Sequence, residues 1–536
     1  MRQYLKKLLH MKTLQQQNEA ANRSVERQGQ SGETATETLT EDLNDNLNKC
    51  KLLLGKDSCD VISRELVSGG RYKFRCVVLY LNSMADTETI NQHIIKPLLY
   101  ERPAVREREA DTAHRFAWIK TEMLSVGFMQ EISTLDEVAE QFLQGNTILL
   151  IEGSVKALAL KSDGWEKRAI QEPTSEIVIR GSREGFVESL AINISLLRRI
   201  IRHPSFRIET TRIGDYTKTL VGVAYIDGIV NPELIEEIRR RLGQIKIDGI
   251  LESGYIEQLI EDDPLSPFPT LNNSERPDVV AAKLLEGRAA IIIDGTPFVL
   301  TAPQLFIEGF QSPDDYYLRP YYASIVRLIR FLSFIITINI PAIYVALMSF
   351  HQEIIPTSLL ISIAEANEGT PFNSFVDALS IGIIFEMIRE AGLRLPRAIG
   401  QTISIVGALV VGQTAVSAGL IGAPVVIMMA ITSICSFVVV GMNDASAMLR
   451  ILTLLLASVF GGYGVVCAYL LMLIHLASLR SFGTPYLAPF VPWSGQGLKD
   501  SFIRSPLRAM WQRPETIARQ NLRRMSPDQG GKNDQT

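Results

Sequence analysis

Four long apolar segments in the second half of the chain constrain its fold more than any other feature. They cover residues 331–350, 398–417, 420–440 and 449–477, and they are almost free of charged side chains. A helix needs about 20 mostly apolar residues to span a bilayer. A packed soluble core can explain one such segment, but hardly four. The sequence therefore predicts an α+β membrane protein with a multi-span α-helical membrane domain over residues 319–480.

The residues that precede these segments carry charge throughout, which indicates a soluble region. Residues 15–38 are rich in Gln, Glu, Thr, Ser and Asn, so we expect residues 1–38 to be disordered. No apolar stretch near the N-terminus resembles a signal peptide, and the five cysteines lack CxxC spacing, as expected for a cytosolic domain. The net charge of -4 is too small to indicate a nucleic-acid partner.

The soluble region alternates between helical and strand patterns, which predicts two tandem α/β subdomains. We expect the first over residues 39–202 and the second over residues 203–318. In the first, helices are expected at 41–54, 87–100 and 134–144, a strand at 72–81 and a strand pair at 147–160. In the second, strands are expected at 206–213 and 219–226, helices at 231–243 and 278–286, and a strand pair at 289–300. A long amphipathic helix after residue 186 is interpreted as a joint between the halves.

A short sequence echo supports the tandem arrangement. The stretch Phe142-Leu-Gln-Gly145 and the apolar run 148–153 match Leu284-Leu-Glu-Gly287 and the run 290–295 at a constant offset of 142 positions. In each copy a helix ends at glycine and an apolar strand turns at an acidic residue followed by glycine. Chance similarity between two ordinary helix-to-hairpin units is the alternative.

Basic residues predict the orientation of the membrane domain. Arg319, Arg327 and Arg330 precede the first apolar segment, which places the N-terminal region in the cytosol. We expect Gly461–Gly464 to break the last apolar segment into a shallow hairpin, so that the basic tail at 481–536 is cytosolic as well. The aromatic stretch 482–493 is then expected to lie along the membrane interface.

Two carboxylates fall in the short predicted crossing at 375–388. Asp377 and Glu386 are candidates for function, because carboxylates within a membrane are costly and tend to face a bundle interior or water. Nine residues apart, they point to opposite faces of a helix and form no shared site. The alternative is that each lies near a membrane interface. Residues 354–364 are too short to span and are expected to be re-entrant or interfacial.

Residues 398–417 carry a stripe of small side chains at four-residue spacing. Gly400, Ser404, Ala408 and Gly412 form the stripe, with Gln401 near one end. Small residues permit close helix packing, and the same smooth surface also suits the wall of a narrow pore. The spacing alone leaves both interpretations open.

Enzyme motifs are absent from the sequence, including Walker A, HExxH, GxSxG and zinc-spaced Cys/His sets. We therefore expect no catalytic, cofactor-binding or metal-binding residues and no enzymatic activity. His475, in an apolar run, is interpreted as a hydrogen-bonded packing or interface residue. The cluster of Arg180, Arg183 and Glu184 fits contact with an anion or a partner, and equally fits a solvated helix start with local ion pairs.

Several ordered blocks resemble one known family. They are the RGSREGF stretch at 180–186, ERPD at 275–278, EGR at 286–288, DGTP at 294–297, DYY at 315–317, AIGQTISIVGALVVG at 398–412 and SFGTPY at 481–486. Together these residues resemble the A subunit of GerA-type spore germinant receptors, over about residues 40 to 525. The polar N-terminal extension has no match in this resemblance.

The resemblance implies a multi-pass protein of the endospore inner membrane, with both termini on the cytoplasmic side. It implies as partners a transporter-like B subunit, a lipoprotein C subunit, membrane lipid and a small-molecule germinant sensed through the complex. It further implies a homo-oligomeric, ligand-gated cation channel whose opening triggers ion release and germination. The pore-lining candidates are then Gln401, Ser404, Ile405, Ala408 and Gly412. The alternatives are a secondary transporter of a small solute or ion and a non-conducting scaffold subunit.

Overall fold

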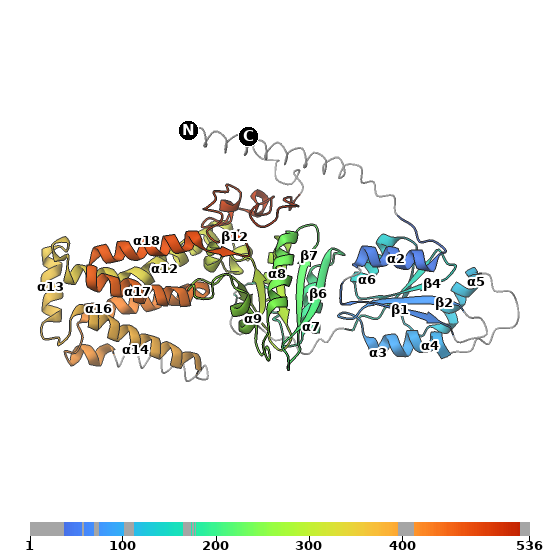
Figure 1. Cartoon of the computed structure of the whole chain (residues 1–536), viewed down its shortest axis with the longest axis horizontal. Coiled ribbons are helices and arrows are strands. Elements are labelled where there is room, and N and C mark those ends of the chain that lie inside the picture. The colour runs from blue at the N-terminus through green and yellow to red at the C-terminus, as the bar shows by residue number, and fades with distance from the viewer. Residues whose placement is uncertain are drawn as a thin grey trace, which may run out of the picture. The chain divides into compact units, whose positions relative to one another are not determined.

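The computed structural model describes residues 37–55, 58–68, 74–100, 112–164, 173, 176, 178, 180–394 and 412–525. The chain forms two compact units, each with its own sheet and hydrophobic cores (Figure 1). The first unit holds residues 1–167 and 198–208, and the second holds residues 168–197 and 209–536. Residues 1–36, most of the tail expected to be disordered, lie outside the described part of the chain.

The first unit contains a five-stranded sheet with helices on both faces (Figure 1). The strand order is β1-β2-β4-β5-β3, and neighbouring strands are antiparallel. Side chains alternate between the faces of a strand, so Val77 of β2 belongs to the core under α2 and α6, whereas Val78 belongs to the opposite core. The elements are α2 Leu43–Leu54, β1 Val61–Val67, β2 Arg75–Leu81, α3 Thr87–Thr89, η1 Ile90–Ile95, α4 Lys96–Tyr100, α5 Thr112–Trp118, η2 Ile119–Met123, β3 Met129–Ile132, α6 Leu135–Leu143, β4 Thr147–Ile151 and β5 Ala157–Leu160.

The second sheet repeats the same topology. Its order is β6-β7-β9-β10-β8, with the strand pairs that involve β9 and β10 antiparallel. Apolar side chains of α8 and α9 pack on one face against Ile291, Ile293 and Leu300. The elements are α7 Leu190–Ile200, β6 Phe206–Ile213, β7 Thr219–Ile226, α8 Pro232–Gln244, α9 Ser253–Ile260, β8 Asn272–Ser274, α10 Pro277–Leu285, β9 Ala289–Ile293 and β10 Val299–Ala302.

The predicted internal repeat is confirmed. The helix–strand–strand unit α6-β4-β5 recurs as α10-β9-β10 with every boundary shifted by 142 positions. The pairing of Ile148 with Ala159 likewise recurs as Ala290 with Thr301. The helix interpreted as a joint is α7, which precedes the strands of the second copy in chain order as α2 precedes those of the first. The boundary between the two compact units falls within α7, between Leu197 and Arg198, in keeping with that interpretation.

The helical region follows the second sheet directly. Its elements are α11 Asp314–Tyr317, α12 Pro320–Ser349, α13 Thr357–Asn367, α14 Ser374–Arg394, α16 Ala423–Val438, α17 Asn443–Phe460 and α18 Gly462–Ser478. Within the described residues, two helices are long and apolar enough to cross a membrane, α12 and α17, while α16 and α18 are apolar but shorter. The expected multi-span domain is thus supported in part: the helices form, and two of them pass the length and composition test.

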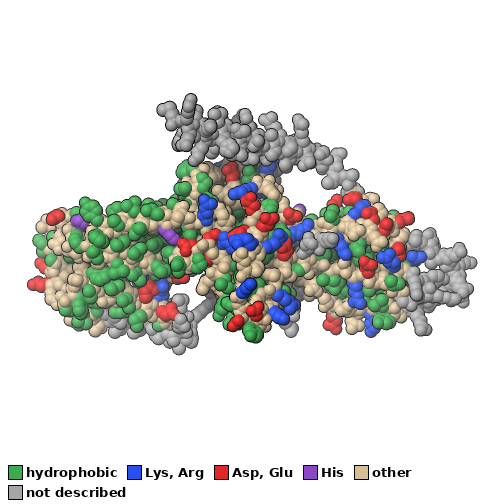
Figure 2. All heavy atoms as spheres, in the orientation of Figure 1, with side chains coloured by type: hydrophobic (Ala, Val, Ile, Leu, Met, Phe, Trp, Pro, Cys, Tyr) green, Lys and Arg blue, Asp and Glu red, His purple; other side chains and the backbone are tan. Residues whose placement is uncertain are grey.

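The outward faces of these helices are apolar. Figure 2 shows hydrophobic side chains gathered over the helical region, whereas charged side chains dominate the sheets. Ile427 and Ile434 of α16 and Ile474 of α18 are each more than 60% exposed. An exposed apolar surface of this kind marks contact with lipid or with another protein.

The predicted break in the last apolar segment is confirmed. Gly461 adopts φ 59° and ψ -136°, which ends α17 and starts α18. A Cβ at this position would lie 2.8 Å from the ring of Phe350, so the backbone geometry and the close approach both require glycine. The two arms have 18 and 17 residues, so the hairpin is deeper than expected.

The C-terminal segment, residues 480–525, packs on the second α/β domain. The hydroxyl of Ser481 donates to the carbonyl of Thr270 at 2.6 Å. Phe482 is buried in the core of this domain beneath the guanidinium of Arg241, 4.3 Å from its ring centroid, and Tyr486 is fully buried. Val491 and Trp493 are exposed, so the interfacial position expected for 482–493 stays a prediction.

Candidate functional site

Four of the blocks that carry the family resemblance, RGSREGF, ERPD, DGTP and DYY, meet where the second sheet is followed by α11. The backbone N–H of Arg180 donates to Asp314 at 3.3 Å. The hydroxyl of Tyr317 donates to Asp278 at 2.7 Å, and Asp278 also pairs with the buried guanidinium of Arg276 at 2.7 Å. Burial and the hydrogen bond to Asp278 raise the pKa of the Tyr317 phenol to about 12. Blocks separated by more than 100 residues thus form one structural junction.

The loop that contains Arg180 continues along this junction. Its Gly181 has φ 152°, and a Cβ there would lie 2.9 Å from the ring of Tyr317. Further along, the N–H of Phe186 donates to the carbonyl of Glu275 at 2.7 Å, and the N–H of Leu190 donates to Asp294 at 2.9 Å. The loop therefore ties the DGTP turn, the ERPD turn and the start of α11 together.

A buried charge network connects this junction to the first long helix. Arg327 of α12 donates through Nε to Asp315 at 2.8 Å and through Nη1 to Asp500 at 2.8 Å. Arg330 adds a second bond to Asp315 at 2.9 Å. Tyr316 donates to the other oxygen of Asp500 at 2.8 Å, and burial together with the charge of Asp500 raises its pKa well above the ordinary value. Buried charges of this kind need all their partners, so the network fixes α12 to the C-terminal segment.

A second buried network lies in the same domain at the end of α10. Glu308 accepts from Lys283 at 3.0 Å and from Arg288 at 2.6 Å. Arg288 also pairs with Glu286 at 3.3 Å. Burial lowers the pKa of Lys283 and raises that of Glu286, and the neighbouring opposite charges only partly offset this desolvation. The EGR block is therefore part of the scaffold that positions the chain just before α11.

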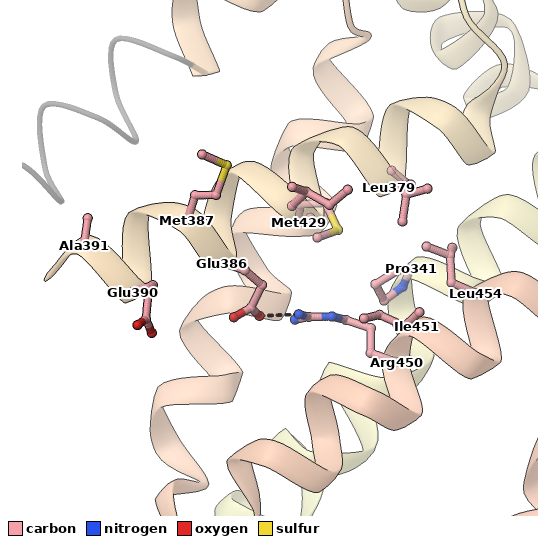
Figure 3. A pocket seen from close by; sticks show the side chains of 13 residues that line it. Pro341, Leu379, Glu386, Met387, Glu390, Ala391, Met429, Arg450, Ile451 and Leu454 are labelled. Atoms are coloured by element: carbon pink, nitrogen blue, oxygen red, sulfur yellow. Dashed lines mark hydrogen bonds and ion pairs between the residues drawn. The ribbon is translucent and has the colours of Figure 1, made fainter. Parts of the chain in front are cut away.

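A pocket of about 630 Å³ lies among the helices, lined by residues of α12, α14, α16 and α17 (Figure 3). Its walls are largely apolar, with Pro341, Leu379 and Met429 among them. Glu386 of α14 and Arg450 of α17 point toward each other and form an ion pair across it. Arg389 holds the other oxygen of Glu386 at 2.6 Å. The pocket thus combines an apolar lining with one charge pair that links two helices.

Asp377 and Glu386, the two predicted carboxylates, occupy different surroundings. Asp377 is 3% exposed, and its Oδ1 has no hydrogen-bond partner among the described residues. The amide of Asn367 donates to the hydroxyl of Tyr344 at 3.4 Å, and the Oδ1 of Asn367 is likewise buried without a partner in this part of the chain. The structure does not bring Asp377 to the pocket that Glu386 lines.

The pore-lining candidates fall largely outside the described residues. Gln401, Ser404, Ile405 and Ala408 belong to the range 395–411, which the structure does not describe. Gly412 is described, and a Cβ there would lie 3.4 Å from Cγ1 of Val426 on α16. Gly412 therefore lies against a neighbouring helix, and the pore assignment stays a prediction.

The remaining predicted residues have clear places. His475 bonds to the hydroxyl of Ser266 at 2.8 Å and stacks on Phe268 with the ring centroids 6.1 Å apart, as expected for a packing residue. Arg180 lies at the junction, where its backbone rather than its side chain makes the bond to Asp314. The N–H of Glu184 donates to the hydroxyl of Ser182 at 3.2 Å within the same loop. No group of three metal-ligating side chains occurs among the described residues.

Sequence reasoning missed the residues that hold the helices in place. Arg450 stands in an apolar segment, and that position alone is a signal that it needs a carboxylate partner. Arg327 was interpreted only as a marker of orientation, although its side chain is 1% exposed and pairs with Asp315 and Asp500. Nothing in the local sequence around Asp500 indicated its role, because its partner Arg327 lies 173 positions away in the chain.

Two antiparallel α/β domains, followed by apolar helices that are tied back to the second domain by buried charges, define a soluble domain pair joined to a membrane-type helical region. The chain matches the family described as Bacillus/Clostridium GerA spore germination protein over residues 48–516. It therefore belongs to the GerA family of spore germination proteins.

The chain is also similar to individual proteins and to one solved domain. Spore germination protein KA of Bacillus subtilis (strain 168) is 43% identical over 474 residues, 88% of this chain and 86% of the relative. A Bacillus subtilis protein described as uncharacterized membrane protein YfkQ is 41% identical over 472 residues, 88% of this chain and 90% of the relative. The crystal structure of the N-terminal domain of the A subunit of the Bacillus megaterium spore germinant receptor GerK3 matches with 34% identity and a TM-score of 0.39, over 51% of this chain and 98% of that domain.

Proposed function

We propose that this protein is the A-type subunit of a germinant receptor in the spore inner membrane. Its apolar helices span the bilayer, and several copies form a ligand-gated cation channel. Membership of the GerA family and the relatives named for spore germination support the receptor role. The apolar outward faces of α16 and α18 and a relative described as a membrane protein support the location. The role is non-enzymatic.

The observation that carries this proposal is the buried network of Arg327, Asp315 and Asp500. A receptor must couple ligand binding at one site to a conformational change at another. It does so by shifting the equilibrium between two conformational states of the protein. A buried charge network is suited to this task, because it holds α12 to the second α/β domain in one arrangement, and losing one partner leaves the others uncompensated. If a partner subunit changed position and displaced the second α/β domain, α12 would move together with that domain.

The proposed partners follow from the family. A transporter-like B subunit senses the small-molecule germinant, and a lipoprotein C subunit completes the complex. Both termini lie on the cytoplasmic side, in keeping with the arginines that flank α12 and with the docking of the C-terminal segment on the α/β domain. Gln401, Ser404, Ile405, Ala408 and Gly412 are the proposed pore-lining residues.

Ion flux from vesicles that contain the reconstituted complex tests the channel. Adding germinant should raise cation permeability, and Gly412→Leu should change that permeability while the subunits still co-purify. Ala418→Leu, at an exposed position beyond the stripe, is the matched control. Unchanged flux from Gly412→Leu and Ala408→Leu, with intact assembly, would contradict the pore assignment.

A secondary transporter is the second candidate function, and the pocket between Glu386 and Arg450 is the observation that favours it. A transporter binds its substrate near mid-membrane and exchanges it across the bilayer. Counterflow of labelled solute, accelerated by unlabelled solute on the other side, would identify a transporter. A complex that assembles but moves neither ions nor solute would identify a scaffold subunit.

A further inference from the structure

A second cavity lies within the second unit, between the α/β domain and the nearest ends of the helices. It has a volume of about 740 Å³ and is distinct from the pocket of Figure 3. Residues of α9, of the stretch 266–274 and of the turn before α17 line it. Ligand cavities in proteins commonly have volumes of about 300–1,000 Å³. We call this space the junction cavity.

The junction cavity is strongly acidic. Its lining includes five carboxylates, those of Glu176, Glu257, Glu261, Glu308 and Asp444, against one guanidinium. The guanidinium belongs to Arg330, which already donates hydrogen bonds to Asp315 and to the carbonyl of Phe310. Glu308 is neutralised by Lys283 and Arg288 behind the wall. Glu176 accepts a hydrogen bond from the hydroxyl of Ser274 at 2.6 Å, whereas the lining supplies no cation for Glu257, Glu261 or Asp444.

Glu257 and Glu261 account for much of this excess of negative charge. Glu257 lies in the last turn of α9 and Glu261 caps its C-terminal end four positions later, so both like charges face the same cavity and repel each other. Within the part of the chain that the structure describes, neither carboxylate forms an ion pair. Two carboxylates that share a partly buried space without a cation are costly, and the cost is relieved by protonation or by a positively charged occupant.

An independent observation concerns Gln304, which also lines the junction cavity. Its side chain is 3% exposed, and its Oε1 is buried without a hydrogen-bond partner among the described residues. Buried carbonyl oxygens are nearly always hydrogen-bonded, so an unpartnered one calls for a donor. Gln304 Oε1 and the carboxylates of Glu257 and Glu261 are acceptors, so a cation with N–H donors can satisfy them together.

We infer that the junction cavity binds a small organic cation that carries an ammonium group. Glu257 and Glu261 supply the opposite charge, Gln304 Oε1 accepts one N–H, and the apolar part of the wall, which includes Leu271, Phe298 and Met448, receives the carbon chain. An organic cation fits better than a bare metal ion, because the described residues hold no group of three metal-ligating side chains. This site goes beyond the proposed channel, since it lies on this chain's own α/β domain.

The site also touches the helices. Asp444 lies in the first turn of α17, and Met442 and Asn443 precede it in the cavity wall. A bound cation would therefore contact both the α/β domain and the start of the α17–α18 hairpin. Occupancy of the junction cavity would favour one relative placement of the two.

Thermal unfolding of the full-length protein in detergent micelles tests the inference, with n-butylammonium chloride as the probe. Tetramethylammonium chloride, which has no N–H donor, potassium chloride and 1-butanol are the comparison solutes at equal concentration. We expect a saturable rise in the unfolding temperature with n-butylammonium only. Glu257→Gln should raise the dissociation constant at least tenfold, and Gln304→Met should raise it about threefold or more. Glu236→Gln, exposed on α8, should leave it unchanged.

A loss of binding by Glu257→Gln would not result from misfolding. The substitution removes an uncompensated charge, so the variant is expected to fold at least as well as the parent protein. An equal response to potassium chloride would assign the cavity to inorganic cations and overturn the proposal. A response to n-butylammonium that Glu257→Gln leaves intact, or no saturable response at all, would overturn it as well. These results are independent of ion flux, so they do not depend on whether the protein is a channel.

Discussion

Arg327 of α12 and Asp500 of the C-terminal segment form an ion pair with Nη1 and Oδ1 2.8 Å apart, in which the guanidinium is buried and the carboxylate is 26% exposed. They join the start of the first long helix to a segment that follows the last one. The guanidinium is 1% exposed and has Asp315 as its second carboxylate partner. The pair makes the C-terminal segment a structural part of the helical region's attachment.

The first prediction concerns this pair. Asp500→Asn leaves the buried guanidinium of Arg327 with Asp315 as its carboxylate partner. Because Asp500 is itself 26% exposed, we expect a loss smaller than the ~3–5 kcal/mol typical of a fully buried pair. We expect a lower unfolding temperature and faster trypsin cleavage within residues 500–525. Asp215→Asn, at an exposed loop position, is the control and should change neither property. Parent-like stability and protease resistance of Asp500→Asn would show that the pair does not hold the segment.

The second prediction concerns Glu386 and Arg450. Glu386→Leu leaves the buried guanidinium of Arg450 without this carboxylate, whereas Arg450→Leu leaves Glu386 with Arg389 as a partner. Both single variants should be destabilised, Glu386→Leu the more strongly. The double variant Glu386→Leu/Arg450→Leu should recover most of the loss, because a hydrophobic pair of similar volume is often as stable as a buried ion pair. Thermal unfolding of all four proteins gives the coupling energy. Purely additive losses would rule out a direct interaction.

The third prediction concerns pH. Burial, with Glu261 and Glu252 nearby, raises the pKa of Glu257 from 4.5 to about 7. The folded protein therefore holds a proton that the unfolded chain has lost between about pH 4.5 and 7, so stability falls as pH rises through this window and stays lower above it. Glu257→Gln should remove this part of the slope and raise stability at pH 8 by roughly 2 kcal/mol. An unchanged pH profile for the variant would mean that Glu257 is not the titrating group.

The fourth prediction compares two glycines. Gly461→Ala places a Cβ 2.8 Å from the Phe350 ring and strains the turn between α17 and α18, which should cost ~1–3 kcal/mol. Gly243→Ala lies in helix α8 with open space around the new methyl group, and it should stabilise the protein by about 0.5–1 kcal/mol. Chemical unfolding of both variants checks the contrast. Equal effects would mean that Gly461 is not required at the turn.

The sequence predicted the elements with strong periodicity. The structure contains three of the expected features: the strands at 206–213 and 219–226, the helix α8, and the unit repeated at an offset of 142 positions. Each has a clear apolar pattern bounded by turn residues. Short elements were missed, including β3, β8 and α9, since three to eight residues give too little periodicity to detect. The fold class was therefore predictable at the level of the repeat.

The candidate site was much less predictable. Glu386 was identified because a carboxylate in an apolar stretch is unusual, but its partner Arg450 is 64 positions further along the chain. The junction between Tyr317, Asp278 and Arg180 depends on loops that meet only in the folded chain. Local patterns indicate which residues are costly to bury, whereas only the tertiary structure shows which groups compensate them.

The C-terminal segment, packed on Thr270 and Leu285 of the second α/β domain, has a mechanical consequence. The helical region leaves this domain at α11 and returns to it at β11 Arg480–Ser481, so it is anchored at two points rather than one. A region attached at one point can rotate about any axis through that point, whereas a region attached at two points can rotate only about the axis that joins them. A movement of the domain would therefore tilt the helices about that one axis.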